Sequence, residues 1–294
     1  MNKKVIQEFT ATNSDIGIRL DLYLTGKMDI TRSRAQKIIR DQLIKVGGNA
    51  ETAKYTLQKG DLVSVFAENK TEVPEIPIIF EDKDILVIDK PAGITTHPAP
   101  GENDVTISEI FEDKYTGKMA TERDNIVHRL DKGTSGLMVL AKHESAREAL
   151  AKQFATRGVN KKYLALVVGR VTPKEGIIDM PLARDLVSKN RIAPADEGKD
   201  AKTLYKVEQY YGGYTLVSAN PKTGRTHQIR VHFSAIGHPL YGDLRYGASE
   251  KKAKRIFLHA AELSFLHPRT GERVSFKSKL PVELDKILGS LTIE

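Results

Sequence analysis

The sequence predicts an α+β fold in two domains: a small N-terminal α/β module and a larger domain with helices flanking a mixed, largely antiparallel sheet. Three observations lead to this prediction. Short apolar runs separated by turn residues recur along the chain, as expected for the strands of such a sheet. Residues 203–211 and 214–219 flank Gly212 and Gly213, which is a strong signal for a hairpin. A polar stretch with prolines at residues 68–77 is suited to a linker.

The composition favours a cytosolic protein with an anionic partner. The chain has 294 residues, of which 40% are hydrophobic, enough for one small and one larger core. Its formal net charge of +8 favours polyanions, although basic composition alone is a weak sign of nucleic acid binding. The absence of cysteine excludes disulfides and thiolate metal sites, and it suits a reducing cytoplasm. Residues 1–10 lack the apolar core of a signal peptide, and no apolar run is long enough to span a bilayer, so we expect no membrane association.

The N-terminal module, residues 1–67, is expected to contain a basic helix. Thr31 is a candidate N-cap for a helix through Arg40. Three apolar residues follow helical spacing on one side, and the basic residues spread over the rest: Ala35, Ile38 and Ile39 against Arg32, Arg34, Lys37 and Arg40. Short strands are predicted at residues 43–46 and 62–65. A basic face beside a small sheet can follow a phosphate backbone, but the charge pattern alone fits an ordinary solvated helix better.

The larger domain, residues 78–294, combines predicted strands with predicted helices. Apolar runs and turn residues give the strands, and apolar residues at helical spacing give the helices. Strands are expected at residues 85–88, 137–140, 163–168, 203–211 and 214–219 and again from residue 257, and helices at residues 107–118, 143–154 and 222–236.

A charged loop at residues 128–136 comes just before the apolar run 137–140, which predicts a loop held beside a buried strand. In this loop Asp131 lies between Arg129 and Lys132, and nearby glycines allow tight backbone geometry and close approach of a ligand. Neighbouring cations favour the ionised carboxylate that a nucleophile or a base requires. The alternative is structural: Asp131 caps the turn or pairs with Arg129, because ordinary ion pairs also produce such clusters.

Two further arginines, Arg225 and Arg230, are expected near the beginning of the helix in residues 222–236. Cations gain nothing from the helix dipole there, so an anionic partner is one reason for their position. Three histidines in the same region raise the possibility of a metal, but their spacing fits no usual pair of ligands on one helical face. We therefore expect no metal site.

Four segments of the larger domain resemble one known family. His-Arg-Leu-Asp-Lys-Gly-Thr-Ser-Gly-Leu, residues 128–137, closely resembles the signature of the RluA/RluD-type RNA pseudouridine synthases. The segments at residues 84–93, 161–163 and 224–232 resemble further blocks of that family, in the same order along the chain. The resemblance implies the pseudouridine synthase fold and an isomerase that converts uridine in RNA to pseudouridine.

The resemblance also implies roles for individual residues. The aspartate of the Arg-Leu-Asp triplet is the catalytic residue of the family, and it corresponds to Asp131. Arg230 would pair with this carboxylate, and Tyr163 would stack on the target base. Arg129 would fill the space left by the everted base or grip a phosphate, with a simple ion pair as the alternative. The reaction has no net redox change and transfers no group to another molecule, so no cofactor is expected.

The N-terminal module resembles an S4-like RNA-binding domain. The resemblance rests on Arg-Leu-Asp at residues 19–21, Thr-Arg-Ser-Arg-Ala at 31–35 and Gly-Asp-Leu-Val at 60–63. The residues expected to bind RNA are Arg19, Arg32, Arg34 and Lys37 in this module and Arg225 in the larger domain.

Family members with such an extension commonly act on large-subunit ribosomal RNA, so that RNA is the expected substrate, with transfer RNA as the second choice. The protein is also expected to be a monomer. The rival is a non-catalytic S4-type RNA-binding module, against which the carboxylate of Asp131 argues because it repels phosphate.

Overall fold

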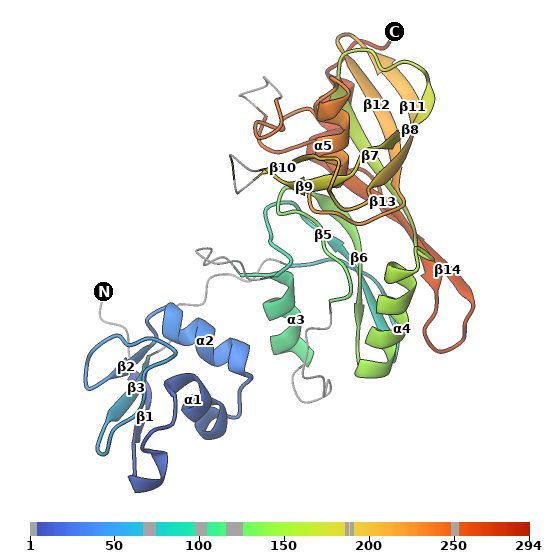
Figure 1. Ribbon diagram of the computed structural model, residues 1–294. Coiled ribbons are helices and arrows are strands. Elements are labelled where there is room, and N and C mark those ends of the chain that lie inside the picture. The colour runs from blue at the N-terminus through green and yellow to red at the C-terminus, as the bar shows by residue number, and fades with distance from the viewer. Residues whose placement is uncertain are drawn as a thin grey trace. The chain divides into compact units, whose positions relative to one another are not determined.

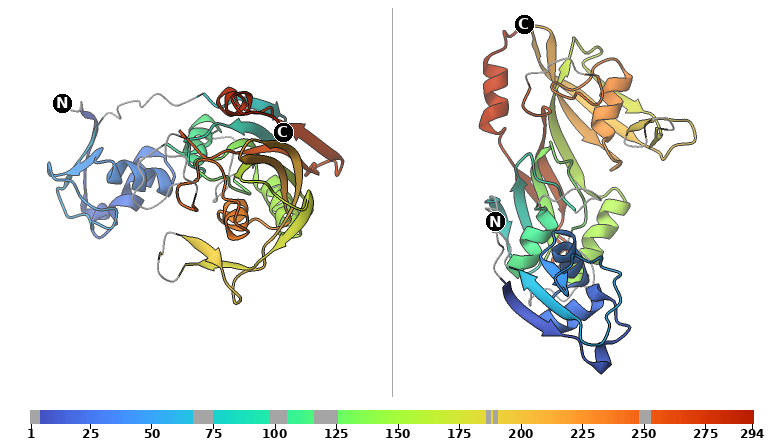
Figure 2. Two further views of the ribbon diagram at one scale, coloured as in Figure 1. Left: turned by 90° about the horizontal axis from the view of Figure 1, so that it is seen from above. Right: turned by 90° about the vertical axis from the view of Figure 1, so that its left-hand side faces the viewer.

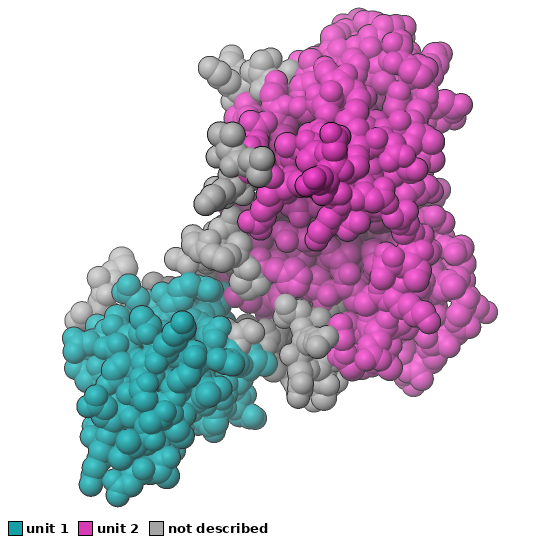
Figure 3. Space-filling model, in the orientation of Figure 1, with its two compact units in different colours: residues 1–73 teal, residues 74–294 magenta. Residues whose placement is uncertain are grey.

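The computed structural model describes residues 5–66, 75–97, 105–115, 126–185, 188, 191–247 and 253–294. The chain divides into two compact units, residues 1–73 and residues 74–294, which are coloured separately in Figure 3. No helix in these ranges is long and apolar enough to cross a membrane.

The first unit packs two helices against a small antiparallel sheet (Figure 1). The sheet has the order β1-β3-β2, from β1 (Val5–Thr10), β3 (Leu62–Phe66) and β2 (Ile44–Val46). A short 3₁₀ turn at Asn13–Asp15 precedes the helices α1 (Leu20–Met28) and α2 (Arg32–Arg40). The sequence predicted α2, β2 and β3, and these predictions are confirmed.

Helix α1 was not predicted, because leucines at positions 20, 22 and 24 alternate as in a strand. In the structure Leu20, Tyr23 and Leu24 are buried at helical spacing, whereas Leu22 remains 44% exposed.

The predicted cap and apolar stripe of α2 are confirmed. The side chain of Thr31 accepts a hydrogen bond from the backbone N–H of Arg34 at 3.2 Å. Ala35, Ile38 and Ile39 are buried in the core of the unit. Lys37 is buried as well, so the solvent-facing basic surface of α2 is narrower than the spacing predicted.

The second unit is built on a sheet that is almost entirely antiparallel. Among the described residues its order is β4-β5-β6-β13-β7-β12-β11-β8, with β14 paired to β13. The strands are β4 (Ile78–Glu81), β5 (Ile85–Lys90), β6 (Ser135–Ala141), β7 (Asn160–Val168), β8 (Glu175–Asp179), β11 (Lys202–Tyr211), β12 (Tyr214–Pro221), β13 (Leu258–Leu266) and β14 (Arg273–Lys277). A separate pair is formed by β9 (Leu182–Arg184) and β10 (Ile192–Pro194). The pairing of β6 with β13 is parallel, and the expected α+β class is confirmed.

Four helices lie on this sheet and beside it in the described part of the unit (Figures 1 and 2). They are α3 (Ile107–Tyr115), α4 (Glu144–Ala155), α5 (Gln228–Ala235) and α6 (Val282–Gly289). Successive residues of β5 point to opposite faces, so α3 packs against Leu86 and Ile88 while α4 packs against Ile85 and Val87. The helix predicted at residues 107–118 is confirmed to residue 115, and residues 116–118 lie outside the described residues.

The parallel pairing of β6 and β13 depends on Gly136. This residue has φ of +117°, and a Cβ atom there would lie 2.4 Å from the carbonyl oxygen of Ala260. A glycine therefore allows β6 to approach β13 closely. This approach fixes the point at which the preceding loop, which carries Asp131, enters the sheet.

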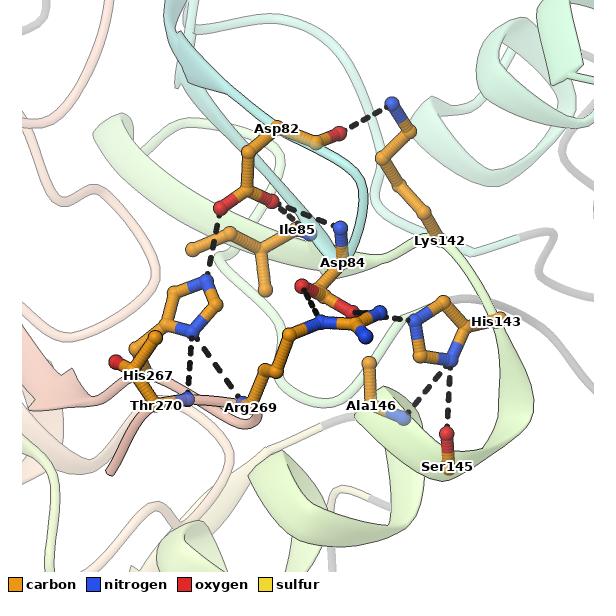
Figure 4. A network of polar contacts seen from close by, with 10 residues as sticks. All are labelled: Asp82, Asp84, Ile85, Lys142, His143, Ser145, Ala146, His267, Arg269 and Thr270. Atoms are coloured by element: carbon orange, nitrogen blue, oxygen red, sulfur yellow. Dashed lines mark hydrogen bonds and ion pairs between the residues drawn. The ribbon is translucent and has the colours of Figure 1, made fainter. Parts of the chain in front are cut away.

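A network of ion pairs joins three segments that are far apart in the sequence (Figure 4). Asp84, at the start of β5, accepts two hydrogen bonds from Arg269 at 2.7 and 2.5 Å and contacts His143 at 2.8 Å. The ring of His143 also caps α4 by accepting from the backbone N–H of Ala146 at 3.3 Å. Asp82 pairs with His267 at 2.8 Å. The network therefore ties the β4–β5 turn to the start of α4 and to the β13–β14 turn.

This network also contains a group of potential metal ligands. One ligand atom from each of Asp82, Asp84 and His267 lies within 4.8 Å of the others. Both carboxylate oxygens of Asp84 already accept from the guanidinium of Arg269, which supplies the compensating positive charge. We therefore interpret the group as a structural ion network.

We predict that Asp84→Asn lowers the free energy of unfolding at pH 7 by about 1–3 kcal/mol, because it removes a charge-assisted hydrogen-bonded pair. The Arg269 guanidinium beside Asp84 holds the pKa of this carboxyl well below its usual range. The stabilisation is thus complete at neutral pH and is lost as the pH falls below the unfolded value of about 3.9. In urea unfolding, the difference between wild type and variant should shrink from pH 7 to pH 3.

Asp179→Asn is the matched control, because Asp179 pairs with Lys202 at the surface with its own side chain 52% exposed. This control should cost less than about 1 kcal/mol. Equal losses in the two variants at pH 7 would contradict the role given to Asp84.

Candidate active site

A cavity of about 370 Å³ opens in the second unit where four segments meet. They are the loop before β6, the end of α4, the start of β7 and the loop that leads into α5. The face of this unit in Figure 3 is hollowed between the part that carries α5 and the part that carries α3 and α4. The cavity is lined by all five site residues that the sequence predicted in this domain: Arg129, Asp131, Tyr163, Arg225 and Arg230.

Asp131 and Arg230 form an ion pair across the cavity floor. Nη1 of Arg230 donates to Oδ2 of Asp131 at 3.1 Å. On its other side Arg230 donates to both carboxylate oxygens of Asp243, from Nε at 2.7 Å and from Nη2 at 3.0 Å. At the side chain Asp243 is 1% exposed and Asp131 is 18% exposed. The contact between Arg230 and Asp243 is therefore buried, whereas the Asp131 carboxylate faces the cavity. Such two-pronged contacts fix the plane of a guanidinium.

The electrostatic environment keeps Arg230 charged. Burial alone would lower the pKa of Arg230, but hydrogen bonds and charge interactions with Asp243 and Asp131 raise it overall. The sequence did not single out Asp243, although it lies in the Tyr-Gly-Asp segment at residues 241–243. Nothing local in the sequence marked it, because its burial and its pairing with Arg230 arise only in the folded chain.

The loop before β6 is anchored by His128. Its Nε2 accepts a hydrogen bond from the backbone N–H of Val139 at 3.1 Å, and its ring stacks on Phe154 with centroids 4.5 Å apart. Burial lowers the pKa of His128 to about 3, so this ring is neutral and accepts at physiological pH. Arg129 is exposed at the cavity, and among the described residues no ion pair joins it to Asp131. The structure therefore does not support the alternative in which Asp131 pairs with Arg129.

Strand β7 supplies Tyr163 and Lys161, which share one side of the strand because they are two residues apart. Burial, with the negative charge of Asp131, raises the pKa of the Tyr163 phenol well above its usual range. This hydroxyl therefore stays protonated and does not act as a base at neutral pH. Burial lowers the pKa of Lys161 to about 8. The sequence did not single out Lys161, since a lysine at a strand end usually lies in solvent.

The loop into α5 is held from inside by Gln228, which is buried. Its Oε1 accepts from the hydroxyl of Thr223 at 2.6 Å and from the backbone N–H of Arg225 at 3.0 Å. Its Nε2 donates to the carbonyl of Lys202 at 3.0 Å. Arg225 itself is exposed at the cavity and donates from Nε to the carbonyl of Asp200 at 2.9 Å. The loop is thereby fixed before α5 begins at Gln228.

The three histidines that raised the question of a metal have separate partners. His227 contacts the hydroxyl of Tyr246, His232 contacts the hydroxyl of Thr203, and His238 contacts the carbonyl of Val168. Their arrangement is that of individual hydrogen-bonded side chains, and the expectation of no metal stays a prediction.

In the first unit the predicted RNA-binding residues Arg19 and Arg32 pair with a buried carboxylate. Arg19 and Arg32 both donate to Asp21, at 2.9 and 3.0 Å, and Gln36 adds a third contact at 2.8 Å. Asp21 is fully buried, which alone would raise its pKa, yet these donors lower the pKa well below its usual range. This buried group around Asp21 was not predicted from the sequence. Arg32 is still 53% exposed at the side chain, so it can contact a ligand while it pairs.

Comparisons with known proteins agree with this arrangement. The family model described as RNA pseudouridylate synthase matches residues 84–235, and the S4 domain model matches residues 18–63. The RNA pseudouridine synthase YlyB of Bacillus subtilis (strain 168) is 37% identical, over 97% of this chain and 97% of its own length. Ribosomal large subunit pseudouridine synthase D of Nitrosomonas europaea is 35% identical, over 97% of this chain and 87% of its own length.

A solved structure leads to the same family. Human RNA Pseudouridylate Synthase Domain Containing 1 has a TM-score of 0.61 and 27% identity to this chain. The match covers 75% of this chain and 89% of the human chain. The chain thus belongs to the RNA pseudouridine synthase family of isomerases and carries an S4 domain in its N-terminal unit.

Proposed function

We propose that this enzyme isomerises specific uridines of large-subunit ribosomal RNA to pseudouridine, with Asp131 as the catalytic residue. The observation that carries the catalytic assignment is the Asp131 carboxylate, held by Arg230 at 3.1 Å and open to a cavity. The substrate assignment is supported by relatives named ribosomal large subunit pseudouridine synthase D, which match almost the whole chain at 35% identity. We further propose that the enzyme acts as a monomer in the cytoplasm.

The target nucleoside has to leave the RNA stack to reach the carboxylate. A cavity of about 370 Å³ lies within the usual range for small-molecule sites, about 300–1,000 Å³. A duplex cannot enter such a space, so the uridine is everted into it. The exposed Arg129 lies at the cavity, where its guanidinium can occupy the vacated position in the stack or bind a flanking phosphate.

The chemistry is an internal exchange of bonds. The bond between N1 of uracil and C1′ of the ribose breaks, a bond between C5 and C1′ forms, the proton on C5 leaves and N1 gains a proton. Asp131 attacks the nucleoside or takes a proton from it, and both roles need an ionised carboxylate. Arg230 favours that form by holding one oxygen. No electron acceptor or donor is needed, because the product is an isomer of the substrate.

Tyr163 and the surrounding cations position the RNA in this proposal. The ring of Tyr163 lies in the cavity wall and stacks on the uracil, and its protonated hydroxyl is available as a donor. Arg225 and Lys161 line the same cavity and neutralise phosphates next to the target. In the S4 domain Arg19, Arg32 and Arg34 remain the proposed RNA-binding residues, whereas the burial of Lys37, which is 6% exposed, argues against that role for it. The proposed domain limits are 1–67 and 78–294, joined by a linker at 68–77.

We predict that Asp131→Asn abolishes isomerisation and preserves RNA binding. The rate constant should fall by at least about 10³-fold, because a neutral amide cannot attack carbon or take a proton. The RNA dissociation constant should change by less than about threefold, since the substitution removes a negative charge from an anion-binding surface. Pseudouridine is measured by mass spectrometry of digested RNA, with the surface variant Asp179→Asn as control.

Two outcomes would contradict this proposal. An active Asp131→Asn enzyme would show that the catalytic assignment is wrong. Wild-type protein that binds RNA but forms no pseudouridine in any RNA would favour the non-catalytic binding module.

The substrate is tested separately by mapping pseudouridine in total RNA from cells with and without the gene. We expect lost sites in large-subunit ribosomal RNA, and losses confined to transfer RNA would favour the second choice.

We predict that RNA affinity falls between pH 7 and pH 9 because of Lys161. Burial lowers the pKa of Lys161 to about 8, so the amine loses its positive charge above that pH, whereas an ordinary lysine keeps its charge to about 10.4. Loss of one cationic contact of about 1 kcal/mol weakens binding about fivefold. The measurement is the RNA dissociation constant at constant ionic strength across this pH range.

Lys161→Arg should remove this pH dependence, because guanidinium stays charged. Lys162→Arg is the matched control: the adjacent Lys162 points to the other side of β7 and pairs with Glu208 and Glu262. A Lys161→Arg protein that loses affinity as wild type does would rule out Lys161 as the source.

A further inference from the structure

His227 occupies an unusual backbone position beside the catalytic carboxylate. It is the residue before α5 and has φ of +55°, in the left-handed region that residues other than glycine rarely adopt, although asparagine, aspartate and histidine do so more often than the rest. Residues in such conformations persist where their surroundings hold them, and they are common at functional sites. The conformation turns the imidazole of His227 towards the cavity, with its side chain 14% exposed.

A chain of polar contacts runs through this imidazole to Asp131. The backbone N–H of Ile192, in β10, donates to the hydroxyl of Tyr246 at 3.1 Å. The same hydroxyl lies 2.8 Å from Nδ1 of His227. The other ring nitrogen, Nε2, lies 3.8 Å from Oδ2 of Asp131. The chain thus joins the β9–β10 pair to the catalytic carboxylate.

The donors along this chain select one tautomer of His227. The oxygen of the Tyr246 hydroxyl accepts a hydrogen bond from Ile192. The hydrogen of the same hydroxyl needs an acceptor, and among the described residues that acceptor is Nδ1 of His227. The hydroxyl therefore donates to Nδ1, and the neutral ring carries its hydrogen on Nε2. Burial lowers the pKa of His227, with Arg230 and Arg245 acting in the same direction and Asp131 and Asp243 in the opposite one. The ring is accordingly neutral at pH 7.

We propose that His227 is a positioning residue that directs its Nε2–H at Oδ2 of Asp131 and, with Arg230, leaves Oδ1 facing the nucleoside. This inference rests on the proposed function of Asp131. Both donors approach the same oxygen, and among the described residues no hydrogen bond reaches Oδ1. A distance of 3.8 Å exceeds a hydrogen bond, but catalytic contacts are often this long in free enzymes and tighten in the substrate complex. A neutral donor orients the carboxylate without adding a second full positive charge that would weaken its reactivity.

The test compares two amides that reach different distances. In His227→Gln the amide nitrogen is as many bonds from the backbone as Nε2 and can donate to Asp131. In His227→Asn it reaches only as far as Nδ1, although asparagine suits the left-handed backbone better. We expect kcat to fall about tenfold in His227→Asn, the equivalent of one charge-assisted hydrogen bond, with KM unchanged within about twofold. His227→Gln should recover most of the rate despite its less favourable backbone.

Tyr246→Phe removes the hydroxyl that fixes the tautomer. Its kcat should fall by a smaller factor than in His227→Asn, about threefold. Tyr210→Phe is the matched control, because it deletes a hydroxyl that donates to the carbonyl of Val171 at 3.0 Å. Tyr210 does not line the cavity. A second readout is independent of activity: the nitrogen chemical shifts of His227 in the wild-type protein should show hydrogen on Nε2 at pH 7.

The outcomes separate this inference from the proposed function. If wild type forms no pseudouridine, the proposed function fails and the nitrogen shifts still decide the tautomer. If wild type is active, the inference is overturned by a His227→Asn enzyme within twofold of wild type, by equal losses in the two amide variants, or by hydrogen on Nδ1. A loss of kcat only in His227→Asn, recovered in His227→Gln, supports it.

Discussion

The structure of the active site depends on one arrangement of charge, in which Arg230 is held between two carboxylates. Asp243 accepts two hydrogen bonds from the guanidinium, and the remaining nitrogen donates to Asp131. An isolated buried guanidinium or carboxylate is costly, so each group is stable only while the others are present. Because Asp243 satisfies most of the charge of Arg230, Asp131 is oriented without being fully neutralised. It remains available to a substrate in the cavity.

The fold brings these three groups together from distant parts of the chain. Asp131 lies in the loop that leads into β6, and Gly136 allows β6 to approach β13 closely. Arg230 is positioned by α5, whose Ile229 and Phe233 pack on β7 and β12. Burial of each such side chain contributes roughly 1.5–3 kcal/mol, so the hydrophobic core determines the geometry of the ionic site. The polar network of Gln228 then fixes the loop that carries Arg225.

Much of the fold could be predicted from the sequence, because the signals are local. The Thr31 cap, the continuous apolar run of β5 and the glycine pair of the β11–β12 hairpin each act within a few residues. Helix α1 could not be predicted in this way, since its leucines also fit a strand and tertiary packing decides between the two.

The site was less accessible to local reasoning. Arg230 and Asp131 are 99 positions apart, and only resemblance to a family connected them in advance. Asp243, Lys161 and Asp21 carried no local signal, because burial and partners give them their properties. His227 was considered only as a possible metal ligand, and its backbone conformation and the Tyr246 contact become visible only in three dimensions.

The most direct test of the central claim is the structure of the enzyme bound to RNA whose target uridine carries fluorine at C5, which cannot leave as a proton does. The account predicts an everted nucleoside in the cavity, with a reacting carbon within about 3.5 Å of Oδ1 of Asp131 or bonded to it, and Arg230 still on Oδ2. A target base that remains stacked in the RNA, or a nucleoside bound away from Asp131, would contradict it.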